Sequence, residues 1–241
     1  MLKIENLTVT YPDQTKGIDD VSLTVMDGES VALIGANGAG KTSLIMSLVG
    51  VLPSSGNVFA EGIKLSEDTL SEIRTKIGVV FQNPDDQLFM PTIYENIAFG
   101  LRNIEMPEKQ IKERIAACLA LLKIEKLGSK TALKISGGEK RLVALATVLI
   151  MEPAIMLFDE PTAFLDPKAR RNLLQVLNVL PHTKLIATHD LSFAAETCQR
   201  SILIKNGKIF ADGLSQDILY DAQLMDKCGV EAIGVYERKL K

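Results

Sequence analysis

The residues with the most specific chemistry lie at positions 35–43, in the sequence GANGAGKTS. The spacing G-x-x-x-x-G-K-T is that of a phosphate-binding loop, because glycines let backbone N–H groups approach phosphate oxygens without an obstructing Cβ. A helix that begins near the end of this loop points its positive end at the same anion. The lysine adds a positive charge, and the threonine hydroxyl is placed to ligand a Mg²⁺ ion shared with the phosphates. We therefore predict that the loop binds a nucleoside triphosphate with Mg²⁺. The residues expected at this site are Gly35, Asn37, Gly38, Ala39, Gly40, Lys41, Thr42 and Ser43.

Two adjacent acids, Asp159 and Glu160, follow an apolar run at 155–158. In P-loop enzymes an aspartate at such a strand end helps to hold Mg²⁺. The glutamate next to it could orient and deprotonate an attacking water. An apolar run followed by two acids is weak evidence on its own, so the assignment of Asp159 to a metal site depends on the phosphate loop elsewhere in the chain.

A third candidate is the sequence Ser136-Gly137-Gly138-Glu139, which directly precedes apolar residues at helical spacing. A serine and two glycines at a helix start can present a hydroxyl and backbone N–H groups to an anion. The same residues also fit a capping box, in which Ser136 and Glu139 satisfy the first helical turn. The local pattern leaves both interpretations open. Because one phosphate loop already accommodates the nucleotide, a second site of this kind suggests the nucleotide of a partner chain.

Three further residues lie at the ends of predicted strands. Tyr11 could stack on an adenine ring, although packing on the sheet explains it equally well. Gln82 could reach a metal ion or a water at the phosphate site, or be an ordinary polar loop residue. His189 directly follows a buried strand.

The predicted strands indicate how these residues are positioned. Alternating apolar and polar residues predict strands at 2–11 and 21–25, an antiparallel sheet that leads into an α/β core. Continuous apolar runs at 154–158 and 185–188 are typical of buried parallel strands. Asn206-Gly207, between two short apolar segments, predicts a hairpin.

The predicted helices lie mainly in the middle of the chain. Apolar residues at helical spacing predict helices that begin at Pro107 and near Gly138, and another over 168–180. Residues 83–150 are therefore expected to be a helical region between two halves of an α/β fold.

The composition restricts the class of protein. The chain has 241 residues, a net charge of −3 and 46% apolar residues, so a sizeable folded core is expected and broad nucleic-acid binding is not. The longest apolar run, 142–151, is far shorter than a bilayer span, and no secretory leader opens the sequence. Three cysteines without metal-site spacing fit a reducing compartment, so we expect a soluble cytoplasmic protein. The basic groups at 168–171 and 238–239 are expected to be solvated faces.

Together these motifs resemble the ATP-binding subunit of an ABC transporter, over about residues 1–230. Residues 35–42 resemble its Walker A loop, 155–160 its Walker B strand and 136–139 its signature. Gln82 is similar to the Q-loop glutamine, Asp166 ends a D-loop-like segment, and His189 and Tyr11 resemble the switch histidine and the adenine-stacking aromatic.

The resemblance implies one P-loop NTPase domain with the fold class α/β. Residues 1–82 and 151–213 would form the nucleotide-binding core with its antiparallel β subdomain, 83–150 an inserted α-helical subdomain, and 214–241 a short helical tail. It implies ATP and Mg²⁺ as cofactors, the metal being held by Thr42, Gln82 and Asp159. Glu160 and His189 would be catalytic. In a head-to-tail dimer Ser136, Gly137, Gly138 and Asp166 would contact the partner's nucleotide.

Within this family, residues 81–100 are especially similar to the A component of energy-coupling-factor importers of cobalt, nickel and vitamins. This implies a second ATP-binding subunit, identical or paralogous, and membrane subunits that dock near residues 82–90, at the cytoplasmic face of the membrane. The apolar residues 88–90, beside two acids, could receive a membrane subunit's helix or pack locally. The transported solute is chosen by those membrane subunits.

Two other classes are weaker alternatives. Non-transport ABC ATPases that act on nucleic acid carry long coiled-coil insertions or two cassettes per chain, and this sequence has neither. A small P-loop kinase would lack the Ser136-Gly137-Gly138 signature.

The sequence departs from the family pattern in four places. Ile135 replaces the usual leucine, and Leu142 stands where an arginine is common, which puts a salt bridge or a contact across the dimer in doubt. Phe164 stands where a small residue is common, so the approach of this segment to the partner site is expected to differ. The stretch after Val230 is short compared with the C-terminal dimerising segment of several relatives.

Overall fold

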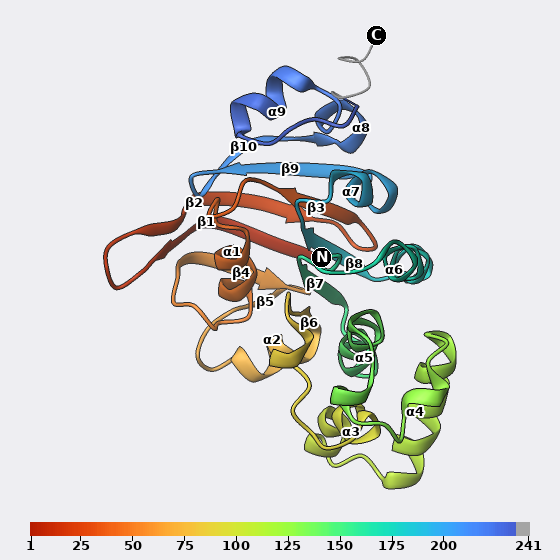
Figure 1. The fold of residues 1–241 in the computed structure, drawn as a ribbon. Helices are drawn as coiled ribbons and strands as arrows, with labels where there is room; N and C mark the ends of the chain where they lie inside the picture. The colour runs from red at the N-terminus through yellow and green to blue at the C-terminus, as the bar shows by residue number, and fades with distance from the viewer. Residues whose placement is uncertain (235–241) are drawn as a thin grey trace.

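Two β-sheets form the centre of the computed structural model, which describes residues 1–234 (Figure 1). The four-stranded sheet has the order β2-β1-β4-β5 and is antiparallel. The six-stranded sheet has the order β10-β9-β3-β8-β7-β6 and is parallel except for the hairpin β9-β10. The strands are β1 (Leu2–Thr10), β2 (Lys16–Val25), β3 (Ser30–Ile34), β4 (Ser55–Ala60), β5 (Ile63–Lys64), β6 (Ile77–Val80), β7 (Ile155–Asp159), β8 (Thr183–Ala187), β9 (Arg200–Lys205) and β10 (Lys208–Leu214).

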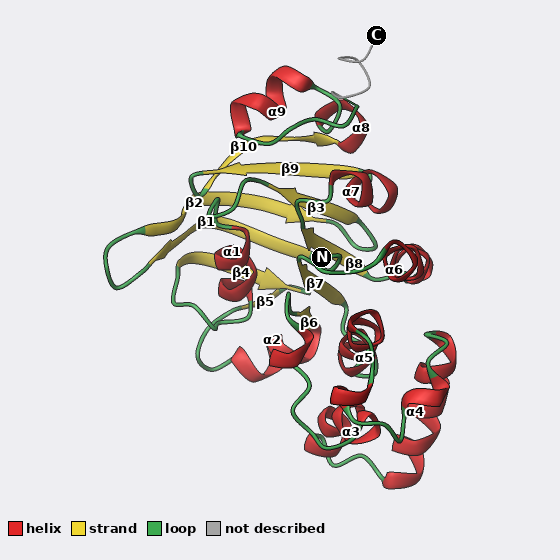
Figure 2. Cartoon of the chain, viewed as in Figure 1, coloured by secondary structure: helices red, strands yellow, loops and turns green. Residues whose placement is uncertain are grey.

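Helices lie on both faces of the six-stranded sheet and in a separate group beyond its β6 edge (Figure 2). The α-helices are α1 (Lys41–Leu48), α2 (Leu70–Lys76), α3 (Ile93–Asn103), α4 (Glu108–Leu121), α5 (Gly137–Leu149), α6 (Pro167–Val179), α7 (Leu191–Thr197), α8 (Ser215–Ile218) and α9 (Ala222–Cys228). Short 3₁₀ turns occupy η1 (Pro84–Asp86), η2 (Glu125–Leu127) and η3 (Ala132–Lys134). Within residues 1–234, no helix combines the length and the apolarity that crossing a bilayer requires.

The six-stranded sheet is covered on both faces, which explains why its central strands are apolar at nearly every position. On one face, Leu33 and Leu157 belong to a core that includes Leu44 of α1 and the inner side of the antiparallel sheet. On the other face, Phe158 shares a core with Phe193 of α7 and with apolar residues of α5 and α6. The predicted buried strands and the α/β core are therefore confirmed.

The antiparallel sheet follows the predicted alternation but is longer than expected. Leu2, Ile4, Leu7 and Val9 of β1 point into the core, and the residues between them are more exposed. The second strand begins at Lys16 instead of residue 21, because β2 pairs with β1 as far as Thr10. Register shifts along this pairing interrupt the simple alternation of apolar and polar residues.

Helices α3, α4 and α5 form the helical region that the sequence predicts between β6 and β7, with α3 packing against α4 and α5. Helix α3 was not anticipated, although its start carries a capping box. The Thr92 hydroxyl accepts a bond from the Glu95 N–H, and the Glu95 carboxylate accepts one from the Thr92 N–H. The basic pair 238–239 and the last residues of the expected tail lie outside the described residues.

Helix α5 packs closely on the edge strand β6 at Gly78. A Cβ at this position would lie 2.2 Å from Val148 Cγ1 and 3.0 Å from Pro153 Cγ. Gly78→Ala should therefore lower the free energy of unfolding by about 1–3 kcal/mol, as overpacked cores do. Gly128→Ala is the matched control, because its Cβ would make an ordinary 3.5 Å contact with Leu119 Cδ1. Denaturant unfolding measures both, and equal midpoints for Gly78→Ala and wild type would contradict this packing.

Candidate nucleotide-binding site

The loop between β3 and α1 depends on glycine at its two ends. Gly40 has φ +109°, and a Cβ there would lie 2.2 Å from the Gly17 carbonyl oxygen. A Cβ at Gly35 would lie 2.4 Å from the Ile204 carbonyl oxygen. The backbone therefore curls between two neighbouring segments that leave no room for a side chain.

Lys41, the first residue of α1, is buried against this loop. Its Nζ donates to the carbonyl oxygens of Gly35 at 2.8 Å and Ala36 at 3.4 Å. The same ammonium lies 3.6 Å from Glu160 Oε1. The Lys41 ammonium therefore contacts both the phosphate loop and the Glu160 carboxylate.

Asp159, the last residue of β7, and Thr42 of α1 form a pair of oxygen atoms that could bind a metal ion. The Thr42 hydroxyl donates to Asp159 Oδ2 at 2.8 Å, and Asp159 is 3% exposed. The pKa of Asp159 lies above its ordinary value, mainly because the carboxyl group is buried. The hydrogen bond from Thr42 lowers this pKa, and the charge of Glu160 raises it. Within the described part of the chain, the buried Oδ1 atom has no hydrogen-bond partner. A hydroxyl beside an unsatisfied carboxylate oxygen fits Mg²⁺, which prefers hard oxygen ligands and neutralises such a charge.

Glu160 is held from several sides and is 7% exposed. Its backbone has φ +46°, and its N–H donates to the Ala187 carbonyl at 2.8 Å. Its Oε2 accepts the His189 backbone N–H at 3.1 Å and lies 2.7 Å from His189 Nδ1. This carboxylate, fixed between Lys41 and a largely exposed histidine, can orient a water at the cavity wall.

A cavity of about 400 Å³ joins these groups. Tyr11 lies at its edge, where the phenol and the Ser43 hydroxyl are 2.8 Å apart. The predicted residues that line the cavity are Tyr11, Asn37, Gly38, Ala39, Gly40, Lys41, Thr42, Ser43, Gln82, Glu160 and His189. The structure thus brings most of the predicted site together, on loops that follow β3, β6, β7 and β8.

Six predicted residues do not line this cavity: Gly35, Asp159, Ser136, Gly137, Gly138 and Asp166. Ser136 and Glu139 form both bonds of the capping box at the start of α5. Asp166 caps α6, accepting from the N–H groups of Lys168 and Ala169 at 2.8 and 2.9 Å. Gly138 packs on α6, whereas no neighbouring atom of residues 1–234 lies within 4 Å of a Cβ built at Gly137. The local capping interpretation is confirmed, and contact with a partner's nucleotide stays a prediction for Ser136, Gly137, Gly138 and Asp166.

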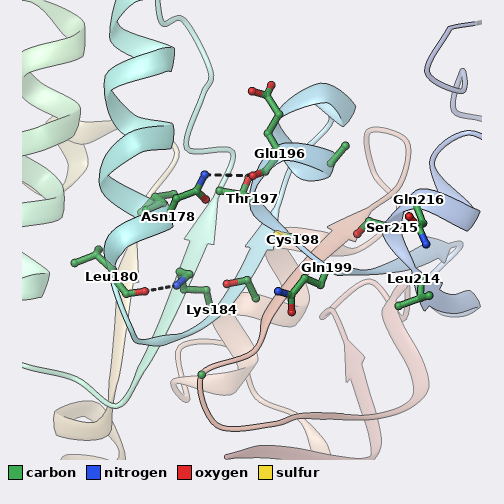
Figure 3. A pocket seen from close by; sticks show the side chains of 14 residues that line it. Asn178, Leu180, Lys184, Glu196, Thr197, Cys198, Gln199, Leu214, Ser215 and Gln216 are labelled. Carbon is green, nitrogen blue, oxygen red and sulfur yellow. Dashed lines mark hydrogen bonds between the residues drawn. The ribbon is translucent and has the colours of Figure 1, made fainter.

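A larger cavity, of about 550 Å³, lies at the opposite ends of the strands (Figure 3). Its lining, all within residues 1–234, includes none of the predicted site residues. Lys184 lies in its wall, where its Nζ donates to the carbonyls of Leu180 at 2.7 Å and His182 at 3.1 Å. The Lys184 ammonium therefore binds carbonyl groups just after α6. Because the predicted site residues line the smaller cavity, we assign the nucleotide to that cavity.

Sequence reasoning missed the contacts of two arginines near the site, and the expectation that residues 168–171 form a solvated face is wrong for Arg170, whose side chain is 23% exposed. Arg141 of α5 donates to the carbonyls of Phe81 and Gln82, and Arg170 of α6 binds Asp190 next to the switch-like histidine. Local sequence gives no signal for either contact, because the partners lie far away in the chain.

Comparison with known proteins finds relatives of this chain. Residues 18–163 match the ABC transporter family model. The energy-coupling factor transporter ATP-binding protein EcfA of Methanothermobacter thermautotrophicus is 38% identical over 236 residues, 95% of this chain and 76% of that protein. EcfA of Carboxydothermus hydrogenoformans is 38% identical over 235 residues, 96% of this chain and 87% of that protein.

Solved structures show the same fold. CbiO1 of Clostridium perfringens, part of the ABC transporter complex CbiONQ, superposes with a TM-score of 0.83 at 33% identity, covering 94% of this chain and 93% of CbiO1. A dimeric ATP-binding cassette in a post-hydrolysis state with ADP and phosphate superposes with a TM-score of 0.80 at 29% identity, covering 89% of this chain and 99% of that one.

The Asp190–Arg170 pair predicts a pH dependence of stability. Burial raises the pKa of Asp190, but hydrogen bonds from Arg170 and from the Phe193 N–H outweigh it, so this pKa lies below its ordinary value. The resulting stabilisation is present above the ordinary aspartate pKa of about 3.9 and is lost as the pH falls through the lower folded-state pKa. Melting temperatures of wild type and Asp190→Asn should differ at neutral pH and converge in acid. A difference that does not change with pH would contradict the depressed pKa.

Proposed function

Because this chain belongs to the family of ABC transporter ATP-binding proteins, we propose that it energises import by an energy-coupling-factor type system. It is an ABC transporter ATPase that hydrolyses ATP. The cargo in this proposal is a metal ion, cobalt or nickel, or a vitamin. Two relatives named EcfA and the structural similarity to CbiO1 support this subgroup.

The observation that carries the catalytic part of the proposal is the placement of Glu160. Its carboxylate is buried, lies 3.6 Å from the Lys41 ammonium and contacts His189, at the wall of the cavity that the phosphate loop closes. A carboxylate in this position can hold an attacking water and accept its proton, while Lys41 and the loop N–H groups neutralise the phosphates.

The other residues of the site have complementary roles. Thr42, Asp159 and Gln82 would hold Mg²⁺, which neutralises charge on the phosphoryl oxygens when bound. Tyr11 would stack on the adenine ring, because it lies at the cavity edge beyond Ser43. His189 would contact the γ-phosphate, because it lines the cavity and most of its side chain is exposed.

The groups that would close this cavity over the nucleotide are assigned here to a second cassette. Ser136 and Gly137 are exposed at the start of α5, where they are free to meet a neighbouring molecule. In a head-to-tail dimer, Ser136, Gly137, Gly138 and Asp166 of one chain would close the nucleotide site of the other. The dimeric cassette structure similar to this chain supports such an assembly.

Residues 82–90 offer a surface for the membrane subunits. Leu88 is buried in the core of the helical region, so its side chain packs locally. Phe89, in contrast, is 65% exposed and contacts Phe99 edge to face, with ring centroids 5.0 Å apart. This apolar pair beside Asp85 and Asp86 would receive a helix of an integral-membrane subunit, and the chain would then lie at the cytoplasmic face of the membrane.

Glu160→Gln tests the proposed catalytic base and the dimer together. The variant should lose turnover by about 10²–10⁴-fold while it still binds ATP, since the phosphate loop and Tyr11 are unchanged. Size-exclusion chromatography with ATP and Mg²⁺ should then show a stable dimer. Glu152→Gln, which changes an exposed carboxylate outside the cavity, is the matched control and should keep wild-type turnover. Normal hydrolysis by Glu160→Gln would show that Glu160 is not the base.

A further inference from the structure

Arg141 is a buried cation that joins three separate segments. It lies on the second turn of α5 and is 2% exposed. Its Nη1 donates to the Phe81 carbonyl at 2.6 Å, and its Nη2 donates to the Gln82 carbonyl at 2.6 Å. The same Nη2 lies 3.5 Å from the Ala163 carbonyl, at the limit of a hydrogen bond. One guanidinium therefore contacts the loop after β6 and the turn after β7.

The charge of Arg141 is held by carbonyl dipoles and not by an ion pair. Among residues 1–234, no carboxylate lies within salt-bridge distance of it, and its buried Nε has no hydrogen-bond partner. Burial lowers the pKa of Arg141 to about 10, against the opposing effect of the Asp159 charge. A buried charge of this kind contributes little net stability compared with a well-packed apolar side chain. What the guanidinium provides is a planar set of donors with a fixed geometry.

The three segments carry different parts of the proposed site. Ser136 caps the helix one turn before Arg141. Gln82 lines the nucleotide cavity. The turn that contains Ala163 runs from Glu160 to Asp166, the cap of α6. Among the described residues, no other side chain of α5 hydrogen-bonds to residues 160–166.

We propose that Arg141 is a positioning residue that makes the signature end of α5, the Gln82 loop and residues 160–166 move together. When Ser136 meets the nucleotide of the partner chain, the displacement of α5 is then carried to Gln82 and to the segment that follows Glu160. This inference rests on the proposed function, because it takes the partner's nucleotide to be the ligand of Ser136.

Steady-state kinetics of the assembled cassette pair give the first test. Arg141→Met keeps much of the side-chain volume and removes the donors. We expect kcat for ATP to fall by about tenfold or more, because small displacements of a catalytic group are costly. KM should stay within about twofold, since the loop that binds ATP is untouched. Arg141→Lys should recover part of kcat, because it restores the charge without the planar geometry.

Arg114→Met is the matched control. Arg114 also lies in the helical region, but it is half-buried, pairs with the exposed Glu152, and does not line the nucleotide cavity. Its variant should keep kcat and KM within about twofold of wild type. A kcat of Arg141→Met equal to that of this control would overturn the proposal.

Hydrogen exchange separates positioning from a purely structural role. In the Glu160→Gln background, ATP and Mg²⁺ should protect residues 35–43, 82–87, 161–166 and the start of α5. With Arg141→Met added, protection of 35–43 should remain, whereas the ATP-dependent protection of 161–166 and α5 should be lost. Exchange without ATP should not change. Unchanged ATP-dependent protection, or faster exchange of α5 to the same extent with and without ATP, would overturn the proposal.

Arg141→Lys keeps the proposal testable if Arg141→Met fails to fold. If Arg141→Met does not fold, Arg141→Lys is measured in the same way, and wild-type protection in it would overturn the inference. If the Glu160→Gln chain alone neither binds ATP nor pairs with a second cassette, the proposed function fails instead. The two failures are therefore distinguishable.

Discussion

The site depends on holding two neighbouring carboxyl groups nearly buried at the end of β7. Asp159 and Glu160 are 3% and 7% exposed, and adjacent charges in such a place repel each other. The surrounding groups compensate in different ways. Lys41 faces Glu160, the Thr42 hydroxyl binds Asp159, and His189 contacts Glu160 from the other side. The unsatisfied oxygen of Asp159 leaves a place for a divalent cation, which would complete this balance.

The parallel sheet explains how residues distant in sequence reach these carboxylates. The ends of parallel strands meet at one edge of a sheet, and ligands of open α/β sheets bind there. The phosphate loop follows β3, Gln82 follows β6, Asp159 ends β7 and His189 follows β8. Arg141 then connects this edge to the helical region through the carbonyls of the β6 loop. The nucleotide cavity and the signature end of α5 are thus parts of one hydrogen-bonded arrangement.

The elements that could be predicted from the sequence are those determined by interactions between residues close together in the chain. The glycine loop, the Asn206-Gly207 hairpin and the continuous apolar strands follow from backbone conformation and burial, and the structure confirms them. Contacts made across the chain could not be predicted. Arg141 looks like any helix-surface arginine until the fold places three carbonyls around it.

The departures from the family pattern illustrate the same limit. Leu142, expected to disturb a salt bridge, packs against the core beside Arg141. Phe164 has φ +61° and is 95% exposed, so nothing in the described part of the chain explains the large side chain. Ser136 satisfies its helix cap within the chain, and its second proposed role depends on a molecule that a single sequence does not contain.

The central claim is that each nucleotide site is shared between two chains, and subunit mixing tests it most directly. Lys41→Ala disables the phosphate loop, and Ser136→Arg blocks the signature end of α5, so each variant alone should be inactive. In an equal mixture, half of the dimers are mixed and each has one intact site. The mixture should therefore regain about a quarter of wild-type ATPase activity if the two sites work independently. A mixture no more active than the separate variants, measured under conditions in which subunits exchange, would contradict the shared site.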